Sequence, residues 1–324
     1  MRRRSWIPIA LVLLIAAAIL AAVLLRKSSP PEAARLLPEA DGLVYINLKP
    51  LRALTHFDRK PVEHDPDYQA FIDATGIQVE RDLEEAAFAL SRRTDPSGPD
   101  GPLAYTEVFV GHFDGKRLAD YLSKNASSKE NYADTDIYLI PHEGRTVRVA
   151  LLGVDIVAAS NTPTPEQIHA VLDRYHTAAL SFTGSSLLKA HYRDVPLLSM
   201  AWAIGRSELA LLPIQQVLPA NPAISKNAII VVSARYVRSL QLRIEEIALS
   251  PEAAKESAEQ LALLLQVLRA VQSSSDPDVQ AVLQSVAVEQ SGNRAVVKAT
   301  IPVPLLEKTF AQPGPKAEQK PDQK

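Results

Sequence analysis

The chain has 324 residues, of which 47 % are hydrophobic and 22 % charged, and this composition excludes a wholly disordered or collagen-like protein. Its 35 Lys and Arg residues nearly balance 37 Asp and Glu residues, but residues 1–27 contain five basic side chains and no acidic one. The remainder therefore has a net charge of −7, which argues against nucleic acid or an anionic membrane surface as its main partner. Because there is no cysteine, disulfides, thiol catalysis, cysteine-ligated metals and lipid attachment through an N-terminal cysteine are excluded.

The first predicted element is a transmembrane helix over Trp6–Leu25, a run of 20 residues without a charge. As a helix this run would be about 30 Å long, the thickness of the hydrocarbon core of a bilayer. Three arginines precede it and two basic residues follow it. The positive-inside rule therefore predicts a cytoplasmic stub at 1–5 and a body on the far side of the membrane, with the lipid bilayer as partner of Trp6–Leu25.

Two processing alternatives remain open for this segment. Ala16-Ala17-Ala18 is a small-residue site at which a cleaved signal peptide could end, and Arg3-Arg4 approaches the twin-arginine export pattern. The apolar run continues past the alanines and is followed by Arg26-Lys27, which favours an uncleaved anchor.

Residues 26–38 follow as a predicted stalk linker, because Ser28-Ser29-Pro30-Pro31 is typical of a stiff spacer. Residues 311–324 have no apolar residue larger than alanine or proline, so we expect a disordered tail. Residues 94–102, rich in proline and glycine, are predicted to form a mobile loop.

The first predicted α+β unit covers 39–183. Helices are expected after Asp65-Pro66, after Asp114 and after Thr164, each of which is an N-terminal capping signal. The predicted strands of this unit are 43–48, 88–90, 105–113, 137–140, 146–152 and 155–159.

The second predicted unit covers 184–310 and repeats this order. A long helix is expected from Pro251 to about Gln272, with an amphipathic stripe from Ala254 to Leu268. In the hairpin before it, Leu240, Leu242 and Ile244 alternate with polar residues, which predicts one wet face. The predicted strands are 198–204, 228–236, 239–249, 282–289 and 294–301. Consecutive hairpins predict the α+β class: a transmembrane helix followed by a duplicated α+β unit, an internal repeat, with largely antiparallel sheets.

The basic-flanked anchor, the motif Leu37-Pro38-Glu39-Ala40-Asp41-Gly42 and the repeated units together resemble uncharacterised bacterial membrane-anchored envelope proteins, a domain of unknown function. The resemblance implies an inner-membrane protein with a single span, a cytoplasmic N-terminus and a periplasmic body. It carries no catalytic residues over to this chain.

Glu166, His169, Asp173 and His176 are the best candidates for a metal site in the sequence. At 100° per residue they fall on one side of a helix and offer nitrogen and oxygen ligands. The opposite side carries Ile168, Val171 and Leu172, so the same pattern describes a solvated helix face. We predict the solvated face and no metal.

Ser186-Leu-Leu-Lys189 matches the Ser-x-x-Lys motif of penicillin-recognising hydrolases, in which the lysine activates the serine. Ser225-Lys226-Asn227 and Lys308-Thr309-Phe310 imitate the two companion motifs, but the second of them lacks the required glycine. One such match is expected by chance in a chain of this composition. We therefore name no catalytic residue and no cofactor.

Metalloprotease, nucleophile-elbow, phosphate-loop and EF-hand motifs are absent from the sequence. We therefore predict a non-catalytic envelope protein that acts as an interaction or scaffold module for an envelope protein partner. The alternative is a periplasmic hydrolase or ligand-binding receptor with a cleft between the two units.

Overall fold

A computed structural model describes residues 29–59, 64–93, 103–142, 144–177, 184–210, 224–271, 277–302 and 305. The expected stub, span, Pro/Gly-rich loop and tail (1–5, 6–25, 94–102 and 311–324) lie outside the described residues. Within the described ranges, no helix has both the length and the apolar character needed to cross a bilayer.

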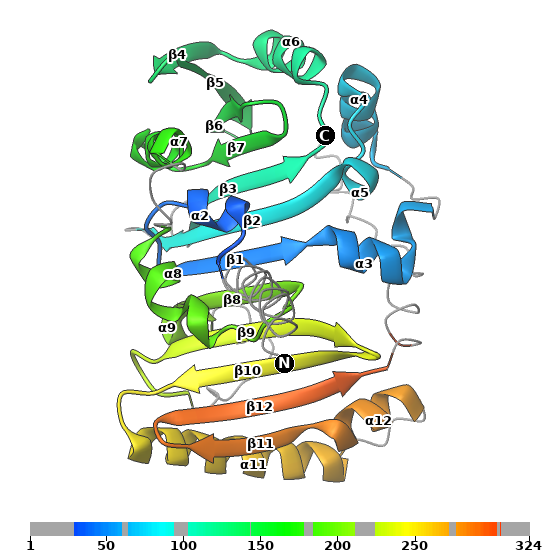
Figure 1. Cartoon of the computed structure of the whole chain (residues 1–324), viewed down its shortest axis with the longest axis vertical. Coiled ribbons are helices and arrows are strands. Elements are labelled where there is room, and N and C mark those ends of the chain that lie inside the picture. Colours follow the sequence, from blue (N-terminus) through cyan, green and yellow to red (C-terminus); the bar gives the residue numbers. More distant parts are fainter. Residues whose placement is uncertain are drawn as a thin grey trace, which may run out of the picture.

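The described residues form one antiparallel sheet of twelve strands with helices packed against it (Figure 1). The spatial order is β11-β12-β10-β9-β8-β1-β2-β3-β7-β6-β5-β4, and every neighbouring pair is antiparallel. The strands are β1 (Gly42–Asn47), β2 (Leu83–Arg92), β3 (Leu103–Gly111), β4 (Ser128–Tyr132), β5 (Thr135–His142), β6 (Arg145–Leu152), β7 (Ile156–Ser160), β8 (Ala201–Arg206), β9 (Ile229–Val237), β10 (Ser239–Ile247), β11 (Ala287–Ser291) and β12 (Arg294–Ile301). The predicted α+β class with antiparallel pairing is confirmed.

The sheet runs without interruption across the expected boundary at 183/184, because β1 pairs with β8. The helices are α2 (Glu32–Leu36), α3 (Leu48–Thr55), α4 (Pro66–Thr75), α5 (Val79–Asp82), α6 (Gly115–Asn125), α7 (Glu166–Thr177), α8 (Ser186–His191), α9 (Ser207–Ala210), α11 (Pro251–Val271) and α12 (Pro277–Ser285), with short 3₁₀ turns η1 (Phe57–Arg59) and η2 (Tyr192–Asp194). We call the line where β1 meets β8 the seam.

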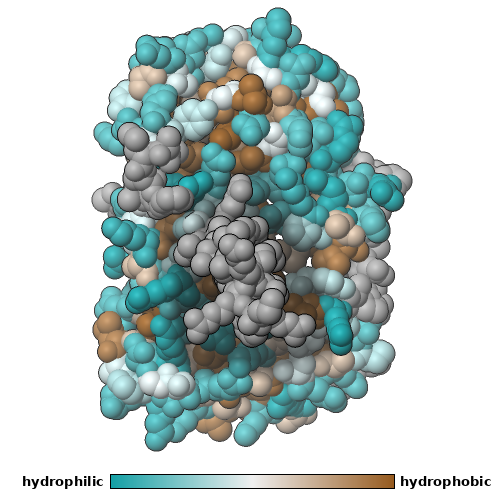
Figure 2. Space-filling view, in the orientation of Figure 1, coloured by the Kyte–Doolittle hydropathy of each residue, from teal (hydrophilic) through white to brown (hydrophobic). Residues whose placement is uncertain are grey.

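Two hydrophobic cores lie on opposite faces of the sheet, as the period of two along each strand requires. The larger core joins α2, α7 and α8 to the face of β1, β2, β3 and β8 that carries Leu43 and Trp202. The smaller core packs α6 on the other face of β5, β6 and β7 through Leu118, Leu122 and Tyr138. Outside these cores, Figure 2 shows a surface covered mainly by hydrophilic side chains, with hydrophobic ones in separate patches.

Residues 32–37 belong to the folded body, which differs from the expected stalk over 26–38. Helix α2 contacts α7 and strands β1–β3, and Ala33, Ala34, Leu36 and Leu37 are at most 1 % exposed. The Ser-Pro-Pro composition suggests a linker only up to Pro31. Beyond it, two small alanines let the helix approach the sheet closely, and the two leucines fill the core.

Several strand boundaries also differ from the sequence pattern. The expected strand 282–289 is divided between α12 and β11, because Pro277 and Asp278 are favoured in the first turn of a helix. Strand β4 has no apolar alternation and was not expected. The long helix α11 and the β9–β10 hairpin lie where the pattern predicts them.

We expect Leu36→Ala to lower the free energy of unfolding by about 3 kcal/mol, because a fully buried leucine would leave a cavity in the larger core. Urea unfolding of the full chain in detergent measures this value. Leu249→Ala is the matched control, since Leu249 is 77 % exposed and should change stability by less than about 0.5 kcal/mol. Equal effects of the two substitutions would show that α2 is a stalk after all.

Candidate functional site: a groove at the seam

A groove of about 830 Å³ lies at the seam, between the sheet and the segment from Tyr192 to Ser199. Its sheet side carries Tyr45 and Asn47 from β1, Glu85 from β2 and Trp202 from β8. Its outer side carries Lys189 from α8 and Arg193 from η2, and its rim includes Ser29, Pro30 and Pro31. We call this the seam groove; it combines aromatic, acidic and basic side chains.

Three aromatic rings form one wall of the seam groove. Tyr45 and Trp202 are direct cross-strand partners and stack with ring centroids 5.5 Å apart. The ring of Tyr192 meets Trp202 edge-on at 5.7 Å. The Trp202 side chain is 3 % exposed, and its indole N–H has no hydrogen-bond partner among the described residues. This aromatic wall (Tyr45, Tyr192, Trp202) therefore contains a buried donor without a partner.

Glu85 supplies a carboxyl group beside the aromatic wall. Burial raises the pKa of Glu85, while the Tyr45 hydroxyl and the charge of Lys49 act in the opposite direction. Burial together with Glu85 also raises the pKa of Tyr45 and of Tyr192. Oxygen Oε2 of Glu85 is buried and accepts no hydrogen bond within the part of the chain that the structure describes. Two residues that line the groove, Glu85 and Trp202, thus each have a buried polar atom without a hydrogen-bond partner among the described residues.

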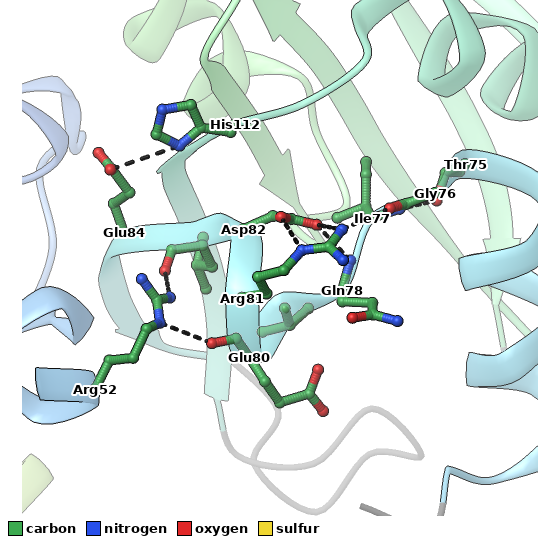
Figure 3. A network of polar contacts seen from close by, with 12 residues as sticks. Arg52, Thr75, Gly76, Ile77, Gln78, Glu80, Arg81, Asp82, Glu84 and His112 are labelled. Carbon is green, nitrogen blue, oxygen red and sulfur yellow. Dashed lines mark hydrogen bonds and ion pairs between the residues drawn. The ribbon is translucent and has the colours of Figure 1, made fainter. Parts of the chain in front are cut away.

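A β-bulge at the start of β2 positions Glu85. The register with β3 shifts between Leu83 and Glu85, so that Glu84 is the extra residue. Glu84 forms an ion pair with Lys49 at 2.7 Å. Its carboxylate also lies 3.5 Å from the His112 ring, a contact that Figure 3 shows. Opposite the bulge only glycine fits at position 111, because a Cβ there would lie 2.4 Å from the carbonyl oxygen of Asp82.

Arg52 fixes the same stretch of backbone from α3. Its Nε donates to the carbonyl oxygen of Glu80 at 2.9 Å, and its guanidinium also donates to the carbonyl of Leu83 (Figure 3). Asp82, held by Arg81 at 2.8 Å, accepts from the backbone N–H of Gln78. These contacts hold the residues that precede Glu85 before the strand begins.

A buried ionic network holds the outer side of the groove. Arg294 on β12 donates to Asp194 at 2.9 Å and to Glu245 at 2.5 Å, and Arg243 also contacts Glu245 at 2.8 Å. The expected wet face of β10 is therefore only partly wet, since Glu245 is 2 % exposed. Burial of this carboxylate depends on two arginines that neutralise it. The network ties η2 to the second half of the sheet.

The four candidate metal ligands on α7, for which we predicted a solvated helix face, each have another contact. The ring of His169 stacks on Tyr132 at 3.8 Å, and Asp173 accepts a hydrogen bond from the Tyr132 hydroxyl at 3.0 Å. Glu166 interacts with Thr164 at the start of its own helix, and the His176 ring lies 5.8 Å from that of Tyr175. Across the described ranges no group of three or more His, Asp or Glu side chains is arranged to hold a metal ion.

Ser186 is held by a carboxylate. Its hydroxyl donates to Glu39 at 2.6 Å, and its backbone N–H donates to the same carboxylate. Lys189 instead lines the seam groove. Of the companion motifs, Ser225 interacts with Ser257 and Glu246, and Lys308-Thr309-Phe310 lies outside the described residues.

The motif at 37–42 has a structural role at the seam. Glu39 binds Ser186 and Arg174, and Asp41 pairs with Arg92 of β2 and Arg206 of β8. A Cβ at Gly42 would lie 2.3 Å from the end of the Leu209 side chain, so a larger residue where β1 enters the seam would force that leucine to move. The residues that carry the resemblance thus connect β1 to both of its neighbours.

Sequence reasoning missed most of the seam groove. Trp202 is buried in the core, but nothing in the sequence indicates that it faces Tyr45. Glu85 lies before the expected strand 88–90, and η2 has no strong local signal. The one signal that could have been noticed is the pair of adjacent acidic residues, Glu84 and Glu85, directly before the apolar run of the expected strand.

A second perturbed carboxyl lies outside the groove. Glu107 on β3 faces away from it, between Phe88 and Ala159 of the neighbouring strands, and burial raises its pKa to about 7. Between pH 4.5 and pH 7 the unfolded chain ionises this group while the folded chain keeps the proton. Stability is therefore lost as the pH rises through this window and stays lower above it.

We expect Glu107→Gln to leave the free energy of unfolding unchanged at pH 4 and to raise it by about 3 kcal/mol at pH 8. Urea titrations at the two pH values measure the difference. Glu256→Gln on the exposed surface of α11 is the control and should have little effect at either pH. An equal effect of Glu107→Gln at both pH values would mean that Glu107 ionises normally in the folded chain.

No family model matches the chain, and no curated protein matches it. Solved structures with a similar chain path include crystal forms IV and I of TP0453, each with a TM-score of 0.48 and 10 % identity, covering 87 % of this chain and 98 % of that one. Crystal form III of TP0453 has a TM-score of 0.47 and 8 % identity, covering 87 % and 99 %. Values this low assign no function.

Proposed function

We propose that the chain is a non-catalytic, membrane-anchored protein of a bacterial envelope whose body binds a ligand in the seam groove. The observation that carries this proposal is that two residues lining one groove, Glu85 and Trp202, each keep a buried polar atom without a partner, the acceptor Oε2 and the indole N–H. Buried polar groups without partners are costly, so a site that leaves two of them open is suited to a ligand that supplies both partners.

The membrane placement rests on Trp6–Leu25 and its basic flanks. It implies a single span in the inner membrane, a cytoplasmic N-terminus and a periplasmic body. The mainly hydrophilic face of the body that Figure 2 shows fits an aqueous compartment. The non-catalytic part of the proposal rests on Ser186, whose hydroxyl is bound by Glu39.

The expected duplication also becomes a proposal. In each half three consecutive strands lie side by side, and the last strand of the half adds next to the third: β7 beside β3, and β12 beside β10. A short helix follows the first strand of each half, α3 after β1 and α9 after β8. The seam groove would then lie where the first strands of two related units meet.

An interaction or scaffold role is the second candidate, and the exposed apolar residues of α11 favour it. Leu263, Leu264, Val267 and Leu268 occupy one side of this helix and are 36–60 % exposed. Strand addition at the sheet edges fits less well, since β4 and β11 have five residues each and carry charges.

Photocrosslinking from position 267 on α11 in intact cells tests the interaction role. Capture of one envelope protein from 267 but not from 256 supports it, and capture of none contradicts it.

Because the chain lacks cysteine, single introduced cysteines report topology directly. We expect Leu249→Cys to react with a membrane-impermeant maleimide in cells whose outer membrane has been permeabilised, because position 249 is 77 % exposed. Ser5→Cys, in the expected cytoplasmic stub, should react only after lysis. Reaction of position 5 alone before lysis would reverse the orientation, and a mature mass lacking the first residues would show a cleaved signal.

A further inference from the structure

The seam groove opens beside the point where the expected anchor joins the body. Ser29, Pro30 and Pro31 form part of its rim, and the expected span ends at Leu25. Four peptide units of at most about 3.6 Å each separate Leu25 from Ser29, so this rim lies within about 14 Å of the end of the span. An anchored chain therefore presents the groove close to the lipid headgroups.

An apolar turn occupies the same rim. Leu197 and Leu198 are 56 % and 68 % exposed and line the groove, and Leu198 has a φ of +65°. A β-branched or bulky residue rarely adopts this conformation, and here the turn is closed by Ser199, which donates to the carbonyl of Pro196 at 2.7 Å. Two leucines held outward next to an anchor are suited to enter the interface of a bilayer.

The groove itself combines groups for both signs of charge. The Glu85 carboxyl and the aromatic wall are suited to an ammonium group, which aromatic faces attract. Lys189 and Arg193, both exposed on the outer side, are suited to a phosphate.

From this arrangement we propose that the seam groove binds the phosphoethanolamine headgroup of a membrane phospholipid. The ammonium lies between Glu85 and the aromatic wall, and the phosphate lies toward Lys189 and Arg193. Leu197 and Leu198 contact the acyl region beside the bound lipid. The proposal rests on the membrane-anchored placement proposed above.

Two features favour this headgroup over other lipids. Glu85 Oε2 lacks a donor, and a primary ammonium provides N–H groups that a quaternary ammonium does not have. The body has a net charge of −7, which disfavours a surface of anionic lipids, whereas a zwitterionic headgroup has no net charge.

Trp202 provides the readout. The chain has two tryptophans, so Trp6→Phe in the full-length protein leaves Trp202 as the sole reporter. The purified protein in detergent micelles is titrated with dihexanoyl phosphatidylethanolamine, dihexanoyl phosphatidylcholine and soluble phosphoethanolamine. We expect a saturable change in Trp202 fluorescence with phosphatidylethanolamine, and affinity at least tenfold lower for the other two.

Glu85→Gln should weaken this binding at least tenfold, and Lys189→Gln at least threefold, because the first removes the ammonium partner and the second a phosphate partner. Glu107→Gln, on the opposite face of the sheet, is the matched control and should bind like the parent. Lys189 is exposed on α8, so its substitution reports on binding even if Glu85→Gln disturbs folding.

The proposal is overturned if phosphatidylethanolamine causes no saturable change, if phosphatidylcholine binds equally well, or if Lys189→Gln and Glu85→Gln both bind like the parent. Equal affinity for soluble phosphoethanolamine would also overturn it, since the occupant would then be a free metabolite. These measurements are made in detergent and do not depend on topology. Failure of the membrane placement would appear only in the cysteine labelling described above.

Discussion

The pairing of β1 with β8 is the constraint on which the rest of the structure depends. These strands join two halves of the chain that are separated by more than 150 residues, and Gly42 and Gly205 face each other at the start of the pairing. In this register Tyr45 lies opposite Trp202, which creates the aromatic wall of the seam groove. If the pairing of β1 with β8 shifted by one residue, the rings of Tyr45 and Trp202 would lie on opposite faces of the sheet and the wall would not form.

Most of the charged groups around the seam have partners, and two buried groups of the groove do not. Asp41 and Glu39 are occupied by arginines and Ser186, and Glu245 and Asp194 by Arg294. Glu85 and the Trp202 N–H are the exceptions among the described groove residues. Both groups cost stability because they are buried without partners, and the paired polar groups around them offset part of this cost. We regard this contrast as the main reason to place a ligand there.

Local signals in the sequence were sufficient for many of the elements and insufficient for the site. The Asp65 and Asp114 caps, the helix α11 and the β9–β10 hairpin depend on residues close together in the chain, and each lies where it was expected. The predicted stripe on α11 is buried at Ala254 and Ala258, whereas Leu268 is 43 % exposed. The pairing of Tyr45 with Trp202 depends on long-range register, which no local pattern encodes.

The expected stalk differs from the structure because Pro30-Pro31 signals a linker, whereas the burial of Ala33 and Ala34 depends on what packs against them. Ser186 matched a catalytic motif by spacing alone, and its partner Glu39 comes from a distant segment.

The most direct test of this account is a disulfide across the seam. Val44 and Ala203 are direct partners, and the hydrogen bonds at Asp41–Arg206 and Asn47–Met200 place them at a position without ladder bonds, where two Cβ atoms lie close enough for a disulfide. With no native cysteine to compete, Val44→Cys combined with Ala203→Cys should oxidise to a closed form that migrates faster on a non-reducing gel. Val44→Cys combined with Ile204→Cys should stay reduced, because those side chains point to opposite faces. The reverse result, or no disulfide in either pair, would contradict the seam and the groove built on it.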